Sequence, residues 1–231
     1  SFAVLDKSGI LKQGLQNLVR SFGGKKYILL LVISLFFMIL GAFFGIFEEV
    51  VPLVPLMLAL SYSLGWDALV GLGMSILATN LGFSAAITNP FTIGVAQEIA
   101  GLPLFSGAWF RIPIFITIYV VFAVFLVRYA RRIERDPSSS FVRDEDQVNR
   151  EKYHLDDFMK PDEHHQQTRN KGLMIFVVTL LLIIAILIGG PFLPVLSDYL
   201  LPVVGLLFLF GSLAAGLTTE RNKRDLFKAL G

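Results

Sequence analysis

The chain has 231 residues, of which 55% are hydrophobic and only 16% are charged, and its mean hydropathy is +0.68. Soluble domains carry about 25% charged residues. The absence of cysteine excludes a disulfide framework and thiolate chemistry. The net charge of +2 comes from basic residues in polar stretches, so the chain offers no basic face for nucleic acid. Composition therefore favours an integral membrane protein.

The charged residues are concentrated in three polar stretches, at 1–26, 128–171 and 220–231. Between them lie apolar blocks, and the block from 172 to 219 contains Asp198 as its only charge. Apolar blocks of about 20 residues separated by charged loops are typical of helices that cross a bilayer. The pattern predicts an all-α polytopic membrane protein.

Residues 1–26 predict an amphipathic helix on the membrane surface, with a helix packed on its own protein as the alternative. Residues 27–64 predict a re-entrant hairpin with its tip near Phe47. The second arm, Val50 to Leu64, has 15 residues and two prolines, which is short for a full span. Two full spans, with the tip at the membrane surface, are the alternative.

Residues 66–101 predict a transmembrane helix that is broken in its middle. The stretch from Thr79 to Pro90 carries two Asn, two Thr, a Ser and a Gly inside an apolar region. Asn89 is suited to cap the second half, and Pro90 to its first turn, where a missing N–H costs nothing. Transporters use such breaks to bind substrates and ions. A kinked structural helix is the alternative.

The rest of the chain predicts three further spans and two polar segments. Basic residues are enriched on the cytoplasmic side of membrane helices, so the polar loop at 129–171 and the tail at 218–231 are predicted to be cytoplasmic, with the spans in the inner membrane. In chain order the segments are a transmembrane helix at 109–128, a loop at 129–171, transmembrane helices at 173–190 and 199–217, and a tail at 218–231.

Glu48 and Glu49 stand at the predicted hairpin tip. A carboxylate at membrane depth is costly, so it points to a function such as carrying a proton or binding a cation. The alternative is a wet tip at which both are interfacial charges. The two side chains point about 100° apart on a helix, which argues against one acid–base pair.

Polar side chains at the break form the second group of candidates for binding a substrate or an ion. Their oxygens, with free carbonyls of the first half-helix, suit a cation such as Na⁺. Polar residues that only cap a kink are the alternative. The substrate or ion candidates at the break are Asn80, Ser84, Thr88 and Asn89, and those for Na⁺ are Thr79, Asn80 and Asn89.

Three segments carry a resemblance to a known family: Gly41 to Glu49, Ala86 to Gln97 and Ser106 to Arg111. Together they resemble the C4-dicarboxylate anaerobic carrier (DcuC-like) family, and most of all its YfcC-like branch, within the ion-transporter superfamily. The resemblance implies two inverted repeats, of which this chain provides about one half. It also implies elevator-type movement and a homodimer in the full-length protein.

These observations predict a secondary transporter for a small solute that bears a carboxylate. The acidic tip favours an amino acid, in particular a basic one, over a C4-dicarboxylate. Transport would be coupled to Na⁺ or H⁺, or would occur by exchange, with no other cofactor. The alternatives are an intramembrane enzyme that uses Glu48 or Glu49, and a structural membrane protein. Because no nucleophile–base pair or metal motif is present, we expect no enzyme.

Overall fold

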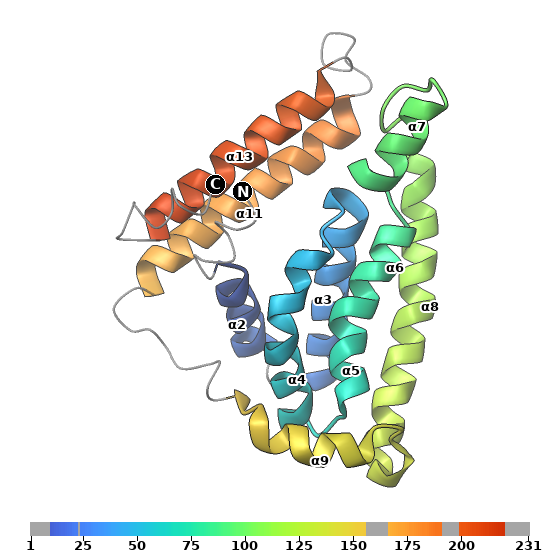
Figure 1. Ribbon diagram of the computed structural model, residues 1–231, viewed down its shortest axis with the longest axis vertical. Coiled ribbons are helices and arrows are strands. Elements are labelled where there is room, and N and C mark those ends of the chain that lie inside the picture. Colours follow the sequence, from blue (N-terminus) through green and yellow to red (C-terminus); the bar gives the residue numbers. More distant parts are fainter. Residues whose placement is uncertain (1–9, 23, 156–165, 191–198, 220–231) are drawn as a thin grey trace. The chain divides into compact units, whose positions relative to one another are not determined.

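The computed structural model describes residues 10–22, 24–155, 166–190 and 199–219 (Figure 1). All regular secondary structure in these residues is helical, which confirms the all-α prediction. The described residues form two units. One unit draws on the ranges 1–17, 93–108 and 161–231, and the other on 18–92 and 109–160. Most of the predicted tail, from residue 220 onward, lies outside the described residues.

Three helices in the described part of the chain are long and apolar enough to cross a membrane: Lys26–Phe44, Ala108–Arg135 and Asn170–Gly189. Shorter apolar helices cover Val50–Ser63, Ala68–Ser84 and Pro202–Thr218. The helix α8, Ala108–Arg135, continues past the predicted end at residue 128. Its last turns carry arginines, which interact favourably with the negative end of a helix dipole.

The unit that contains residues 18–92 and 109–160 is a group of helices packed side by side, with α9 lying across the ends of α4 and α5 (Figure 1). Its elements, in chain order, are α3 (Lys26–Ile39), η1 (Leu40–Phe44), η2 (Glu48–Leu53), α4 (Val54–Ser63), α5 (Ala68–Leu72), η3 (Gly73–Leu77), α6 (Ala78–Ser84), α8, η5 (Pro137–Ser139) and α9 (Arg143–Lys152). The short helices η1 and η3 are π-helical turns.

Two glycines allow α3 with η1 to approach α6 closely. A Cβ atom at Gly41 would lie 2.2 Å from the carbonyl oxygen of Thr79, and one at Gly82 would lie 2.0 Å from that of Met38. Both distances are far below normal contact, so a larger residue at either position would push the backbones apart. Small residues serve the same purpose at many interfaces between membrane helices.

Hydroxyl groups inside this unit donate to backbone carbonyls. Ser75 Oγ donates to the carbonyl of Gly71 at 2.8 Å, and Thr79 Oγ1 donates to that of Ser75 at 2.9 Å. Tyr119 on α8 donates to the carbonyl of Leu31 on α3 at 2.8 Å. Polar groups away from water need such partners, so these residues are compatible with a membrane interior.

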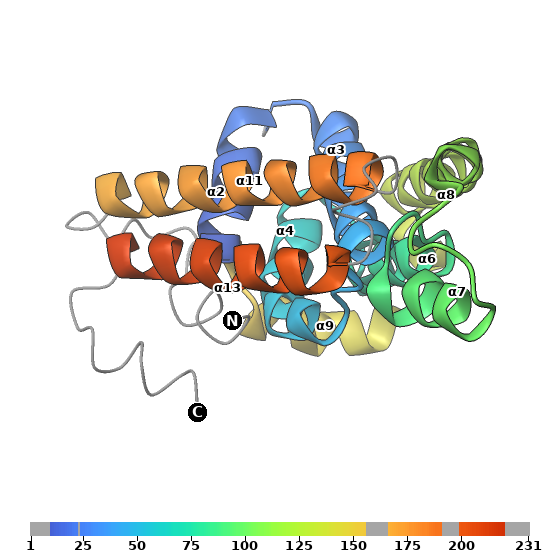
Figure 2. The same cartoon turned by 90° about the horizontal axis from the view of Figure 1, so that it is seen from above.

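The other unit contains α11 (Gln166–Gly189) and α13 (Leu200–Thr219), which lie alongside each other in both views (Figures 1 and 2). They meet closely, since a Cβ atom at Gly211 would lie 2.2 Å from Thr179 Cγ2. The rings of Phe176 and Phe208 also meet, edge to face, with centroids 6.4 Å apart.

The amphipathic N-terminal segment is helical as α2, Ile10–Phe22. Its apolar residue Leu15 is buried, but so are the amides Gln13 and Gln16 on other sides of the helix. The placement of this helix on the membrane surface, or packed on its own protein, stays a prediction. Residues 1–9 of the predicted amphipathic helix lie outside the described residues.

Candidate functional site

The chain reverses direction between η1 and η2, at the position predicted for the hairpin tip. Gly45 ends η1 with a left-handed backbone, at φ 67° and ψ 27°. A Cβ atom there would lie 2.6 Å from Asn89 Oδ1 and 2.6 Å from Phe91 Cδ2. Both the positive φ and this contact require glycine. The reversal is therefore fitted tightly against the break in the second helix.

The break lies between α6, which ends at Ser84, and η4 (Pro90–Gly94), which leads into α7 (Val95–Ile99). Its backbone amides bond to η1: the N–H groups of Ile87 and Thr88 both donate to the carbonyl of Ala42, at 2.9 and 3.2 Å. The last carbonyls of a helix have no partner within it. The break supplies partners for these carbonyls, so reversal and break are joined through the main chain.

Side chains of the break strengthen this joint. Thr88 Oγ1 donates to the carbonyl of Phe43 at 3.2 Å, and Asn89 Nδ2 donates to that of Gly41 at 3.1 Å. Asn89 Oδ1 accepts the N–H of Phe91 at 2.8 Å. The predicted capping role of Asn89 is therefore present. Both side chains are 0% exposed, and each donates a hydrogen bond that holds the joint.

Arg111 also belongs to this joint. Its Nε donates to the carbonyl of Ile87 at 2.9 Å. The sequence favoured an interfacial anchor for this residue, beside Trp109. The structure instead shows the guanidinium bound to the backbone of the break, 24 residues earlier in the chain.

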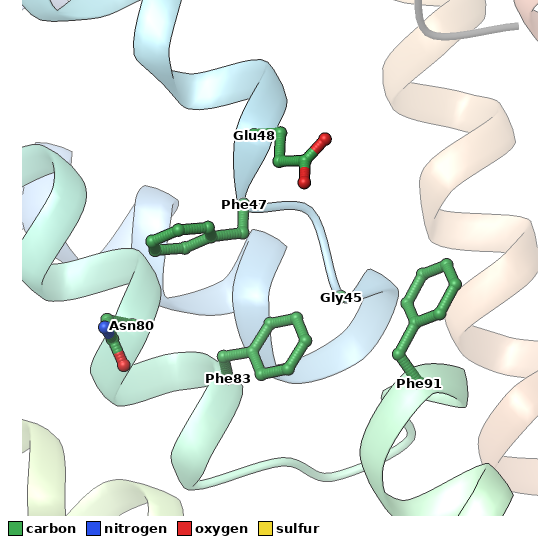
Figure 3. Close-up of a pocket in the computed structure, with 6 residues that line it drawn as sticks. All are labelled: Gly45, Phe47, Glu48, Asn80, Phe83 and Phe91. Carbon is green, nitrogen blue, oxygen red and sulfur yellow. The ribbon is translucent and has the colours of Figure 1, made fainter.

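A cavity of about 540 Å³ lies beside the joint (Figure 3). Phe47 and Glu48 enter it from the reversal, Phe83 from α6 and Phe91 from η4. The rings of Phe47 and Phe83 meet edge to face, with centroids 6.4 Å apart and planes at 70°. The lining residues are Gly45, Phe47, Glu48, Asn80, Phe83 and Phe91.

Among the described side chains, this lining combines aromatic rings with the carboxylate of Glu48. The face of an aromatic ring attracts a cation, and a carboxylate supplies the opposite charge and hydrogen-bond acceptors. Asn80 adds an amide that both donates and accepts. The cavity can therefore hold a small organic molecule whose positive group faces Glu48. Its volume lies within the usual range for small-molecule sites.

The predicted site residues occupy different environments. Glu48, Asn80 and Ser84 are all exposed, and of these Glu48 and Asn80 line the cavity. Thr79 is buried, and its Oγ1 donates to the carbonyl of Ser75. Of the three residues predicted to bind Na⁺, only Asn80 is among the described residues that line the cavity. The side chain of Glu49 lies outside the described residues.

The three phenylalanines of the cavity were not identified from the sequence. The chain contains 21 Phe, and nothing in their spacing distinguishes Phe47, Phe83 and Phe91. One available signal was position: each lies within two residues of Gly45, Glu48, Gly82, Ser84 or Asn89, where the chain reverses or breaks.

A second polar cluster lies at the other end of α4 and α5. Asp67 caps α5 by accepting the N–H of Val70 at 3.0 Å. Its Oδ2 accepts the hydroxyls of Tyr129 on α8 and Ser140, at 2.7 and 2.8 Å. The turn before α5 is thereby tied to the segment that follows α8.

The helix α9 completes this cluster. Asp146 accepts the Tyr62 hydroxyl at 2.8 Å and the N–H of Ala68 at 3.2 Å, and Arg150 donates to the carbonyl of Trp66 at 2.7 Å. Burial raises the pKa of Asp146, while the bonds from Tyr62 and Ala68 act in the opposite direction. Part of the predicted loop at 129–171 is therefore an ordered helix bound to the ends of α4 and α5.

The sequence matches a family model and two curated proteins. The sequence profile described as "C4-dicarboxylate anaerobic carrier" matches residues 1–230. A protein of Escherichia coli strain K12 named "Putative basic amino acid antiporter YfcC" is 31% identical over 152 residues, which are 66% of this chain and 30% of that protein.

An uncharacterized protein of Haemophilus influenzae is 25% identical over 210 residues. These residues are 90% of this chain and 41% of that protein. The chain thus spans less than half the length of the two curated relatives that it matches. No solved structure matches the chain significantly.

Proposed function

Since the chain belongs to the C4-dicarboxylate anaerobic carrier family, whose members are carriers and not enzymes, we propose that its protein is a secondary transporter for a basic amino acid. Binding at the cavity between the reversal and the break would be part of each transport cycle. The expectation of a non-enzymatic membrane protein is confirmed by the family. The substrate and the coupling are the proposal.

The observation that carries the proposal is the pairing of Glu48 with three phenylalanine rings around one cavity. A dicarboxylate would meet repulsion from Glu48, whereas an ammonium or guanidinium group would be attracted by the carboxylate and the rings. The name of the Escherichia coli relative, a basic amino acid antiporter, is consistent with this choice.

The coupling ion is proposed to be Na⁺ or H⁺, with exchange of two solutes as the third form of coupling. Proton coupling would use Glu48, because a carboxylate that alternates between a wet and a dry environment can bind and release a proton. Sodium would use oxygens near Asn80 and the carbonyls at the end of α6. The protein is further proposed to be an inner-membrane homodimer with a cytoplasmic loop at 129–171.

Uptake into proteoliposomes tests the proposal with the full gene product. Labelled arginine, ornithine and succinate are each offered with and without Na⁺ and H⁺ gradients. We expect arginine or ornithine to enter in response to one gradient. Glu48→Gln should weaken apparent affinity for the cation by roughly 10- to 100-fold, because a hydrogen bond to a charged group contributes about 1.5–3 kcal/mol.

Two further variants show whether the cavity is responsible. Phe83→Leu keeps an apolar side chain but removes the ring, and should weaken affinity about fivefold, as expected for a contact of about 1 kcal/mol. Glu98→Gln makes the same change as Glu48→Gln at an exposed residue outside the cavity, and should leave uptake unchanged.

Succinate uptake that is insensitive to Glu48→Gln would refute the basic amino acid and support the family's named C4-dicarboxylate class. Equal effects of Glu48→Gln and Glu98→Gln would show that the cavity is not the site. A protein that is folded but moves none of the three solutes would contradict the proposed substrate.

A further inference from the structure

The helix α8 has two different faces along its second half. One face packs into its own unit: Leu126 is 2% exposed and lies close enough to Gly73 that a Cβ atom there would be 2.7 Å away. The opposite face is open, and Val121 is 66% exposed. A groove of about 550 Å³ runs along this open face, lined by Val120, Val121, Val124, Phe125, Arg128, Tyr129 and Arg132.

The lining residues change from apolar to basic along the helix. Val120, Val124, Arg128 and Arg132 are each four residues apart, so they follow one another along one side of α8. At 1.5 Å per residue, the distance along the axis from Val120 to Arg128 is about 12 Å. Half the hydrocarbon core of a bilayer is about 15 Å thick. With the valines inside one leaflet, the arginines reach the level of its headgroups.

The arginines of the groove keep their charge available. Both Arg128 and Arg132 are exposed, and within the described residues neither lies within 4.0 Å of a carboxylate oxygen. Asp136 attracts Arg132 electrostatically, but its carboxylate accepts the N–H of Ser138 at 3.0 Å. By contrast, Lys26 on α3 is paired with Glu134.

A hydrogen bond and ring stacking hold the two aromatic residues that form the floor of the groove, Phe125 and Tyr129. The Tyr129 hydroxyl donates to Asp67 at 2.7 Å, so the ring cannot turn away from the helix. Phe125 stacks on this ring, with centroids 6.5 Å apart and planes at 14°. A fixed aromatic and aliphatic floor suits an extended hydrocarbon chain, and Arg128 and Arg132 line the same groove toward the C-terminal end of the helix.

We propose that this groove binds a glycerophospholipid with an anionic headgroup, of the phosphatidylglycerol class. One acyl chain would lie along Val120, Val124 and Phe125, and the phosphate would accept hydrogen bonds from Arg128 and Arg132. Guanidinium groups bind phosphate oxygens in pairs, and two positive charges favour a headgroup with a net negative charge. This proposal is independent of the transported solute.

Lipid retention in native mass spectrometry tests the proposal. The full gene product is reconstituted in vesicles with equal amounts of phosphatidylglycerol and phosphatidylcholine, then extracted and weighed with its bound lipids. We expect preferential retention of phosphatidylglycerol. Arg128→Gln should reduce that retention roughly fivefold, because each basic residue near an anionic membrane surface contributes about 1 kcal/mol to binding.

Arg135→Gln is the matched control, because Arg135 is an exposed arginine at the same end of α8 but does not line the groove. It should leave retention unchanged, and Arg128→Lys should restore most of it. Equal retention of both lipids, or an equal loss in Arg135→Gln, would overturn the proposal.

A second copy of the protein in the groove is the rival occupant. This chain contains no cysteine, so Val121→Cys introduces a single thiol into its open face. Efficient disulfide-linked dimers through this thiol in the membrane would overturn lipid binding in favour of a protein interface. Retention of phosphatidylglycerol without cross-linking through this thiol supports lipid binding.

Discussion

Replacing Gly82 by alanine should drive α6 away from α3 and disable the candidate site. The added Cβ atom would lie 2.0 Å from the carbonyl oxygen of Met38 and 2.8 Å from its carbonyl carbon. Carbon–oxygen contacts are normally at least about 3.3 Å, so the two backbones must separate by roughly 1.3 Å. No side-chain rotation can relieve the clash, because both atoms belong to the main chain.

The energetic cost follows from two opposing effects. Overpacking of a close interface costs about 1–3 kcal/mol, and more where backbone must move. Alanine in place of glycine within a helix contributes about 1 kcal/mol in the other direction. Because backbone must move here, the cost is at least the upper value of about 3 kcal/mol, and we expect Gly82→Ala to lower the free energy of unfolding by about 2 kcal/mol or more and to displace Asn80 and Phe83 in the cavity.

Gly205→Ala is the matched control, since Gly205 lies inside α13 with no atom within 4 Å of its ideal Cβ position. It should be neutral or stabilising by up to about 1 kcal/mol. Thermal unfolding in detergent compares the two variants, and proteoliposome uptake reports on the site. If Gly82→Ala unfolded at or above the wild-type temperature and kept full uptake, the close packing of α3 and α6 would be refuted.

Three further variants test other contacts. Gly45→Ala should abolish solute affinity, because the added Cβ atom would clash with Asn89 and Phe91. The control is Gly101→Ala, which has a similar φ of 66° and open space around it and should show only backbone strain. Equal uptake defects in the two variants would contradict a specific role of Gly45 at the site. Asn89→Ala should cost about 1–3 kcal/mol in unfolding free energy, since it leaves the N–H of Phe91 without its acceptor and removes one of the two donors to the carbonyl of Gly41, the other being the N–H of Gly45. Asn89→Asp, which keeps the acceptor, should lose less. The pKa of Asp146 is raised, so the folded state binds a proton at this carboxylate more tightly than the unfolded chain does. Proton binding therefore stabilises the fold fully below about pH 3.9, and this stabilisation is lost as the pH rises through the pKa of Asp146 in the folded state. Thermal midpoints of wild type minus Asp146→Asn should therefore rise as pH falls, and a difference that is flat with pH would argue against a buried carboxylate.

Local chemistry made part of the fold and site predictable. Asn89 was identified as a cap because a capping bond joins residues two or three apart in the sequence, and the structure contains this bond. The membrane class followed from the distribution of charge, which is a property of the whole chain. Glu48 attracted attention because a carboxylate stands out in an apolar region, and it lines the cavity.

Contacts between distant segments were not predictable from one sequence. Nothing near Arg111 indicates that it reaches the carbonyl of Ile87. Asp146 lies in a segment rich in both charges and looks like any solvated acid, yet it is 4% exposed beneath Tyr62. The sequence also does not indicate that the side chains of Thr88 and Asn89 donate to carbonyls of η1, which the tertiary structure shows.

The joint between η1 and the break has a consequence for how substrate selectivity diverges within such a fold. The amides of Ile87 and Thr88 bond to the carbonyl of Ala42, and these groups belong to every amino acid except for the N–H of proline. Mutations of Ala42, Ile87 or Thr88 to residues other than proline leave these main-chain hydrogen bonds of the joint in place, provided that residue 45 remains glycine. Lining residues such as Phe83 and Phe91 can then be exchanged one at a time on a constant backbone. Related proteins can in this way acquire new solutes by point substitution, without passing through an unfolded ancestor.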